Sequence, residues 1–161
     1  MTPLDIWRGA FTRRWHMNPD LSHLDDPICG HHGRYALLVL LLFPDASRDL
    51  LRAAVTHDQA EAVVGDLAMP FKQRGGDLVA AHAALEAAQL AQMGLAVDLD
   101  RLDAFRLTLV DRLDCYLFAA LRVPHVLARA DWIAAGDAIY DLAVELGVGP
   151  VVAAMLQGAR T

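Results

Sequence analysis

The feature that most constrains this fold is a carboxylate, that of Asp58, in the middle of an apolar helical pattern. Leu51, Ala54 and Val55 precede it and Ala62 follows it, at the spacings of three and four residues that mark one face of a helix. A carboxylate on a core-facing position is strongly destabilising unless an ion or hydrogen bonds replace the water that it loses. We therefore expect the fold to supply a charged or polar partner for Asp58.

A second carboxylate, that of Asp114, occupies the same kind of position on another predicted helix. The apolar residues that share its face are Leu107, Val110, Leu117 and Leu121. A lone aspartate in such a stripe is explained by a salt bridge to a buried arginine. Two such carboxylates, together with histidines on predicted helices, favour a shared metal ion instead.

The candidate metal ligands are two imidazoles and two carboxylates: His32, His57, Asp58 and Asp114. This donor set suits a divalent ion such as Mn, Fe, Co, Ni or Zn. His31 directly precedes His32 and can take its role, because only one of two successive helical residues faces a given direction.

Composition and patterning favour a helical bundle. The chain has 161 residues, 55% of them hydrophobic and 7% aromatic, and we expect one domain over residues 1–161. Alanine and leucine are abundant, and no segment shows the alternation that is typical of a strand. We therefore predict an all-α fold, a single compact bundle of about six to seven helices.

Charge, apolar runs and cysteine usage narrow the partners and the compartment. The formal net charge of −6 argues against a nucleic-acid polymer as partner, because phosphate contacts need clustered Lys and Arg. The longest apolar run, 35–43, is far shorter than the roughly 20 residues that span a bilayer, and it indicates a helix buried on all sides. Cys29 and Cys115 do not make a disulfide framework, and nothing resembles a secretory signal. We expect a cytoplasmic protein with reduced thiols and no membrane partner.

Caps, prolines and glycines divide the chain into helices. Candidate N-terminal signals are Thr2-Pro3, Asp26-Pro27, Ser47 and Asp131. The expected helices cover residues 3–13, 27–43, 47–65, 77–92, 100–122, 131–145 and 149–158. The stretches 18–26 and 67–76 are expected to be loops, because they are polar or contain proline and paired glycines.

The order of the candidate ligands along the chain resembles that of the HD-domain metal-dependent phosphohydrolases. The stretch 57–72 contains His-Asp-x-x-Glu-x-x-x-Gly-Asp-x-x-x-Pro-x-Lys. It is similar to the corresponding stretch of bacterial 5'-deoxynucleotidases and of small bacterial and phage enzymes that release triphosphate from dATP. Arg14-Trp15, ahead of the first histidine, also matches that subgroup, and the resemblance covers about residues 8–122. The family usually has Glu-His-Ser where this chain has His31-His32-Gly33, and the following apolar run favours His32 as the ligand.

The resemblance implies the catalytic roles. A divalent ion (Mn, Co, Zn, Fe, Ni or Mg) would be held by the four candidate ligands. Glu61 lies one helical turn after His57, which lets both point into one site, and the resemblance implies that it orients or deprotonates the attacking water. Asp66 matches the family's second acidic position, which orients water or substrate. Without the motif, Glu61 would read as a surface glutamate and Asp66 as a helix-end residue with local hydrogen bonds.

The resemblance also implies the substrate contacts. Arg14 and Lys72 are cations suited to phosphate, and Trp15 matches a tryptophan that crowds the 2' position and favours deoxyribose. Met17 and Pro70 complete the candidate substrate-binding set. Taken alone, the two cations would be solvated surface charges, Trp15 a core residue at a helix end and Met17 core filler.

The expected activity is hydrolysis of 2'-deoxynucleoside 5'-phosphates by a metal-activated water. Two reactions stay open: release of phosphate from a dNMP, and release of triphosphate from a dNTP, notably dATP. The alternatives are hydrolysis of another nucleotide by an HD-type phosphodiesterase, and a non-catalytic helical module that a metal stabilises. The expected partner is a small deoxynucleotide, and a homo-oligomer is expected because small members of the resembling group form dimers or rings.

Overall fold

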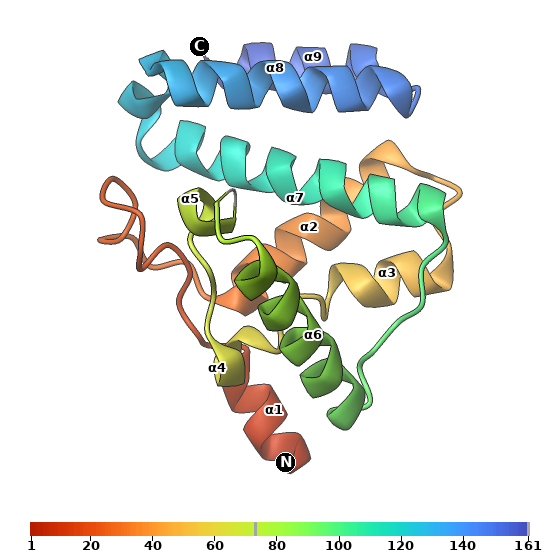
Figure 1. Cartoon of the computed structure of the whole chain (residues 1–161). Coiled ribbons are helices and arrows are strands. Elements are labelled where there is room, and N and C mark those ends of the chain that lie inside the picture. The colour runs from red at the N-terminus through yellow and green to blue at the C-terminus, as the bar shows by residue number, and fades with distance from the viewer. Residues whose placement is uncertain (73, 161) are drawn as a thin grey trace. The chain divides into compact units, whose positions relative to one another are not determined.

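The structure is a computed structural model that describes residues 1–72 and 74–160, apart from the side chains of residues 69 and 70. All regular secondary structure in these residues is helical (Figure 1), which confirms the predicted all-α class. Extended backbone pairs there at an isolated bridge between Arg13 and Pro27. The chain packs into two compact units, which are described separately. Unit 1 comprises residues 1–33 and 52–98, and unit 2 comprises residues 34–51 and 99–161.

Unit 1 contains the N-terminal helix and the short helices in the middle of the chain. Its elements are α1 (Pro3–Gly9), the first residues of α2 (Ile28–Leu42), the last residues of α3 (Arg48–Ala54), α4 (Glu61–Val64), α5 (Met69–Lys72) and α6 (Asp77–Gln92). Helix α4 packs against both α1 and α6. Leu21, Ile28 and Ala54 are fully buried and belong to the core of this unit.

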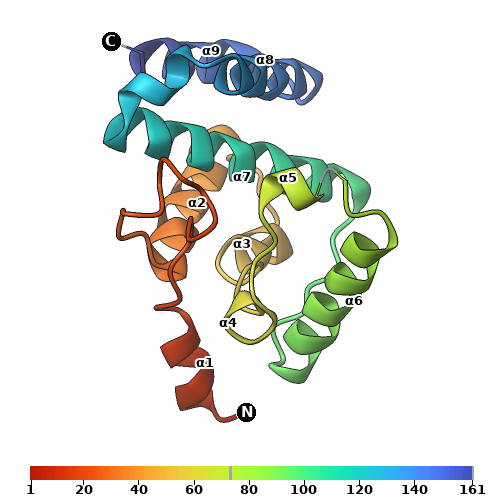
Figure 2. The ribbon, with the colours of Figure 1, turned by 60° about the vertical axis from the view of Figure 1, so that its left-hand side comes forward.

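Unit 2 is built around the longest helix of the described chain. Its elements are the remainder of α2 and α3, α7 (Arg101–Arg122), the 3-10 helix η1 (Pro124–Ala128), α8 (Ala130–Glu145) and α9 (Gly149–Gly158). Helix α8 packs against α7, η1 and α9, and α8 and α9 run side by side in both views (Figure 1, Figure 2). Leu109, Val110, Leu113, Ile139 and Val152 are buried in its core.

Local capping signals place the starts of α1, α3 and α7 where the sequence predicts them, whereas the predicted cap Asp131 lies inside α8, which begins at Ala130. Thr2 and Asp5 form a reciprocal capping box at the start of α1. The Ser47 hydroxyl accepts a hydrogen bond from Leu50 N at 2.9 Å, and the Asp100 carboxylate accepts one from Asp103 N at 2.8 Å. The helices α6 to α9 agree with the predicted ranges 77–92, 100–122, 131–145 and 149–158 to within one residue.

The predicted helix 47–65 is wrong, because the chain leaves the α-helix at residues 55–60 and resumes it only at α4. The hydroxyl of Thr56 donates to Arg52 O at 2.8 Å and so competes for a carbonyl of the preceding turn. Residues 55 and 56 themselves bond three residues back rather than four, to Arg52 O and Ala53 O. The segment that carries His57 and Asp58 is therefore a run of tight turns.

Three further predictions are corrected. Helix α1 ends at Gly9 instead of residue 13. At Gly9 the chain passes so close to α4 that a Cβ on this residue would lie 2.8 Å from the Ala62 Cβ. The predicted loop 67–76 contains the short helix α5. The run 35–43 is not buried on all sides, since Leu37, Leu40 and Leu41 expose more than half of their surface. Within the described residues, no helix combines the length and the apolar character needed to cross a membrane.

Candidate metal centre

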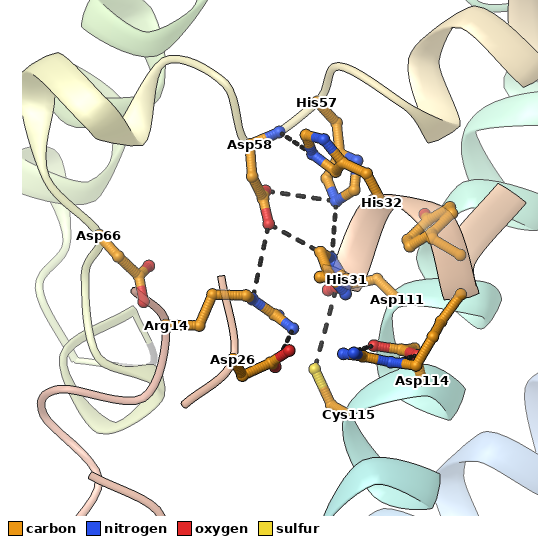
Figure 3. A network of polar contacts seen from close by, with 12 residues as sticks. Arg14, Asp26, His31, His32, His57, Asp58, Asp66, Asp111, Asp114 and Cys115 are labelled. Atoms are coloured by element: carbon orange, nitrogen blue, oxygen red, sulfur yellow. Dashed lines mark hydrogen bonds and ion pairs between the residues drawn. The ribbon is translucent and has the colours of Figure 1, made fainter. Parts of the chain in front are cut away.

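Three metal-type donors converge in unit 1 (Figure 3). His31 Nε2 lies 3.2 Å from His57 Nε2 and 3.3 Å from Asp58 Oδ2. His57 Nε2 lies 3.3 Å from Asp58 Oδ1. One ligand atom from each residue lies within 4.8 Å of those of the other two, so the three form a group that can hold a metal ion.

The tight turns at residues 55–60 carry two of the three donors, His57 and Asp58. Successive side chains of an α-helix are rotated by about 100° from each other, so neighbours face different directions. In the turns, Gln59 N donates to Thr56 O at 3.0 Å and Glu61 N donates to Asp58 O at 3.0 Å, which curls the backbone more tightly. His57 and Asp58 nevertheless point into the same space, with His57 Nε2 3.3 Å from Asp58 Oδ1.

The three-donor group contains His31, whereas the ring of His32 lies beside His57, at 5.0 Å between ring centres, without joining the group. His31 is fully buried. His32 Nε2 instead accepts a long hydrogen bond of 3.4 Å from the backbone N of Asp58. Burial, together with the nearby charge of His57, lowers the pKa of His32 to about 3, so this imidazole is neutral and able to accept. The sequence left His31 open as the alternative ligand to His32, and His31 is the one of the two that belongs to the three-donor cluster.

Asp114 belongs to unit 2, where it forms the salt bridge that was the alternative to metal binding. Its Oδ1 accepts from Arg34 Nε at 2.8 Å and its Oδ2 from Arg34 Nη2 at 3.0 Å, a bidentate pair. The Arg34 guanidinium also lies 4.7 Å from the centre of the Phe118 ring. Asp114 is buried, so the arginine supplies the charge that the apolar stripe of α7 requires. As a metal ligand, Asp114 stays a prediction.

Asp58 carries a negative charge suited to a cation. Burial by itself would raise the pKa of its carboxyl group. His57 and His31 outweigh this effect, helped by the nearby guanidinium of Arg14, and hold the pKa of Asp58 well below its usual range. The cluster therefore offers an ionised carboxylate at any pH near neutrality.

Glu61 has the opposite electrostatics. It begins α4, is only 9% exposed, and lies on the same unit as the cluster. Burial raises its pKa to about 9, and the negative charges of Asp58 and Asp66 act in the same direction. In the absence of a cation, Glu61 therefore holds a proton at neutral pH.

A second set of polar side chains lies around the end of α4. Lys72 Nζ lies 3.1 Å from Asp66 Oδ1, and this carboxylate outweighs burial and raises the pKa of Lys72. His82 Nε2 lies 2.9 Å from Gly65 O, and its Nδ1 lies 3.5 Å from a Glu86 oxygen. His82 and Glu86 stand on α6 four residues apart, and this spacing was the sequence signal by which they could have been included.

The candidate substrate residues Arg14 and Trp15 lie on a strap between α1 and α2. Arg14 Nε lies 4.0 Å from Asp58 Oδ2, so Arg14 reaches the cluster (Figure 3), and its guanidinium carbon lies 5.2 Å from the centre of the Trp15 ring. Met17 is exposed to 66% and follows on the next turn. Pro70 belongs to α5, but its side chain lies outside the described residues.

No family model, no curated protein and no solved structure matches this chain. Membership of the HD-domain family therefore stays a prediction that depends on the motif of residues 57–72 and on Arg14-Trp15. Two of the three converging donors, His57 and Asp58, belong to that motif, and His31 lies outside it.

Proposed function

We propose that this protein is a metal-dependent phosphohydrolase that acts on 2'-deoxynucleoside 5'-phosphates. The observation that carries the proposal is the convergence of His31, His57 and Asp58, with Glu61 buried at the start of the next helix. Two imidazoles and one ionised carboxylate are a donor set that fits a divalent first-row ion. Such an ion, when bound, supplies charge stabilisation to a phosphoryl group and lowers the pKa of water.

Glu61 is the proposed proton acceptor for the attacking water. Its pKa of about 9 makes it an acid in the metal-free chain. A positive charge beside Asp58 lowers this pKa and makes Glu61 a base, because an opposite charge favours the ionised form. Asp66, whose carboxylate forms a salt bridge with the Lys72 ammonium, is the proposed orienting group at the end of the same helix.

Two cations are the proposed phosphate contacts. Arg14 lies beside the Asp58 carboxylate, and Lys72 is a flexible point charge paired with Asp66. Trp15, next to Arg14, is the proposed wall against the sugar, as the deoxynucleotidase resemblance implies. Arg14 and Lys72 both lower the pKa of Glu61, which places their charges within electrostatic reach of this carboxyl group.

The experiment is a nucleotide screen with metal-stripped protein reloaded with Mn, Co, Zn, Fe, Ni or Mg. The substrates are dAMP, dATP, ATP, the other deoxynucleotides and cyclic or signalling nucleotides, and the products measured are phosphate, pyrophosphate and triphosphate. Turnover of a deoxynucleotide that requires added metal, and that Glu61→Gln abolishes, supports the proposal. No product from any nucleotide contradicts it, and retained metal without turnover points to the structural module instead.

A further inference from the structure

A buried carboxylate outside the candidate metal centre, that of Asp26, joins the strap of residues 10–15 to the start of α2. The sequence assigned Asp26 to the start of a helix, but α2 begins at Ile28, and the Pro27 carbonyl accepts from the amides of Gly30 and His31. The Asp26 residue is only 1% exposed. Burying a carboxylate is unfavourable without charged or hydrogen-bonding partners, so the identity of those partners indicates its role.

Two side chains that contact the Asp26 carboxylate are candidate substrate residues. The Trp15 indole Nε1 donates to Asp26 Oδ2 at 2.9 Å, and Arg14 Nη1 lies 3.6 Å from the same oxygen. The backbone closes the contact from the other side, because Arg14 N donates to Asp26 O at 3.0 Å. One buried residue therefore holds the guanidinium and the indole ring next to each other.

The backbone of the strap needs such support. Trp15 has a φ of 67°, in the left-handed region that bulky residues rarely adopt. The strap also runs along the start of α2 through the bridge between Arg13 and Pro27 and through two backbone hydrogen bonds of 2.9 Å, from Ile28 N to Thr12 O and from Cys29 N to Ala10 O. A conformation this unfavourable persists only where surrounding contacts over-determine it, and the hydrogen bond from Trp15 to Asp26 is one of them.

Arg14 connects this arrangement to the metal centre. Its guanidinium lies between two carboxylates, with Nη1 toward Asp26 and Nε 4.0 Å from Asp58 Oδ2 (Figure 3). Without Asp26, the Asp58 carboxylate would be the one of these two that remains beside Arg14, and Asp58 is a proposed metal ligand. Asp26 therefore attracts one side of the Arg14 guanidinium while Asp58 attracts the other.

We propose that Asp26 is a positioning residue that holds Arg14 and Trp15 as one recognition element for a nucleoside phosphate. A cation beside a flat aromatic ring suits a ligand that carries an anionic group next to a sugar or base. This inference rests on the proposed function, because it takes Arg14 and Trp15 to be substrate contacts. Asp26 itself does not touch the reacting atoms, and it acts through its two partners.

The test compares Asp26→Asn and Asp26→Ala with the matched control Asp25→Asn. Asp25 also pairs with an arginine, at 3.1 Å from Arg13, but that pair is more than two-thirds exposed on both sides. With the deoxynucleotide that the wild type hydrolyses, Asp26→Ala is expected to raise KM by about 10-fold to 100-fold, the effect of losing charged hydrogen bonds. A smaller change is expected in kcat, because a lost recognition element weakens substrate and transition state alike. Asp25→Asn is expected to leave both constants unchanged.

A second readout does not depend on activity. In a background in which Trp7 and Trp132 are replaced by phenylalanine, the single remaining tryptophan reports on the strap. Its indole N–H signal in proton NMR is expected to be protected from exchange in the wild type and in Asp26→Asn, where the amide oxygen still accepts, and to lose protection in Asp26→Ala. Should Asp26→Ala fail to fold, Asp26→Asn still separates the charge from the hydrogen bond, with a raised KM and an unchanged indole signal.

Unchanged KM and an unchanged indole signal in the folded Asp26 variants would overturn the inference. A fall in kcat alone, with KM and the indole signal as in the wild type, would also overturn it. If the wild type hydrolyses no nucleotide, the proposed function fails and with it the recognition role. In that case the NMR experiment still decides whether Asp26 holds Trp15, so the two failures are distinguishable.

Discussion

Replacing Glu61 with glutamine should change how the stability of the metal-free protein depends on pH. Burial, with the negative charges of Asp58 and Asp66, raises the pKa of this carboxyl from 4.5 to about 9 in the folded chain. The unfolded chain ionises it near 4.5. Between these two values the folded state binds the extra proton, so the wild type loses stability as the pH rises. The Glu61→Gln variant has no such proton and should not show this loss.

The magnitude follows from the width of the interval. One pH unit within it changes the free energy of unfolding by about 1.4 kcal/mol. Raising the pH from about 5 to about 8 should therefore destabilise the wild type, relative to Glu61→Gln, by up to about 4 kcal/mol. This is an upper limit, because water that enters around a buried charge lowers its cost.

The assay is urea unfolding of chelator-treated protein, followed by circular dichroism at several pH values from 5 to 8. Glu145→Gln, a change at an exposed glutamate of α8, serves as the control and should leave the pH dependence of the wild type unaltered. Adding the divalent ion should shrink the gap between wild type and Glu61→Gln at high pH, since a nearby positive charge lowers the pKa of Glu61. A gap of the same size at pH 5 and pH 8 would refute the electrostatic reasoning.

Four other variants test the donors and the ion pair. Asp58→Ala should lose bound metal and hydrolysis together, and normal metal content measured by elemental analysis would contradict its assignment as a ligand. His31→Ala should lower metal content more than His32→Ala. The reverse order would indicate that His32, which the sequence favours, is the ligand. Asp114→Ala, which removes the buried carboxylate that pairs with Arg34, should lower the free energy of unfolding by about 2–3 kcal/mol in chelator-treated protein, because water can reach the Arg34 side chain, which is 36% exposed. A loss below about 1 kcal/mol would mean that the pair does not stabilise unit 2.

The helices of the second half of the chain could be predicted because their signals are local. Asp100 caps α7 through its own side chain, and Gly94 and Gly147 follow the ends of α6 and α8 with positive φ values of 70° and 76°. A cap or a left-handed glycine acts within one helical turn, so it can be read from a few neighbouring residues. The break at residues 55–60 escaped prediction because the apolar spacing there continues across it. The competing hydrogen bond from Thr56 is visible only in three dimensions.

The sequence by itself determined that Asp114 needs a charged partner, because a carboxylate in an apolar stripe is unfavourable wherever that stripe packs. The same argument for Asp58 assumed a helix that the chain leaves at residues 55–60. The sequence also determined an all-helical chain and placed His57 and Asp58 next to each other. Only the tertiary structure decided who the partners are. Asp114 meets Arg34, eighty residues earlier, and the Asp58 carboxylate meets His31, whereas His32 accepts from the Asp58 backbone. The reason is rotational: the way a helix packs sets which of its sides faces which neighbour, and spacing within one helix carries no record of that angle.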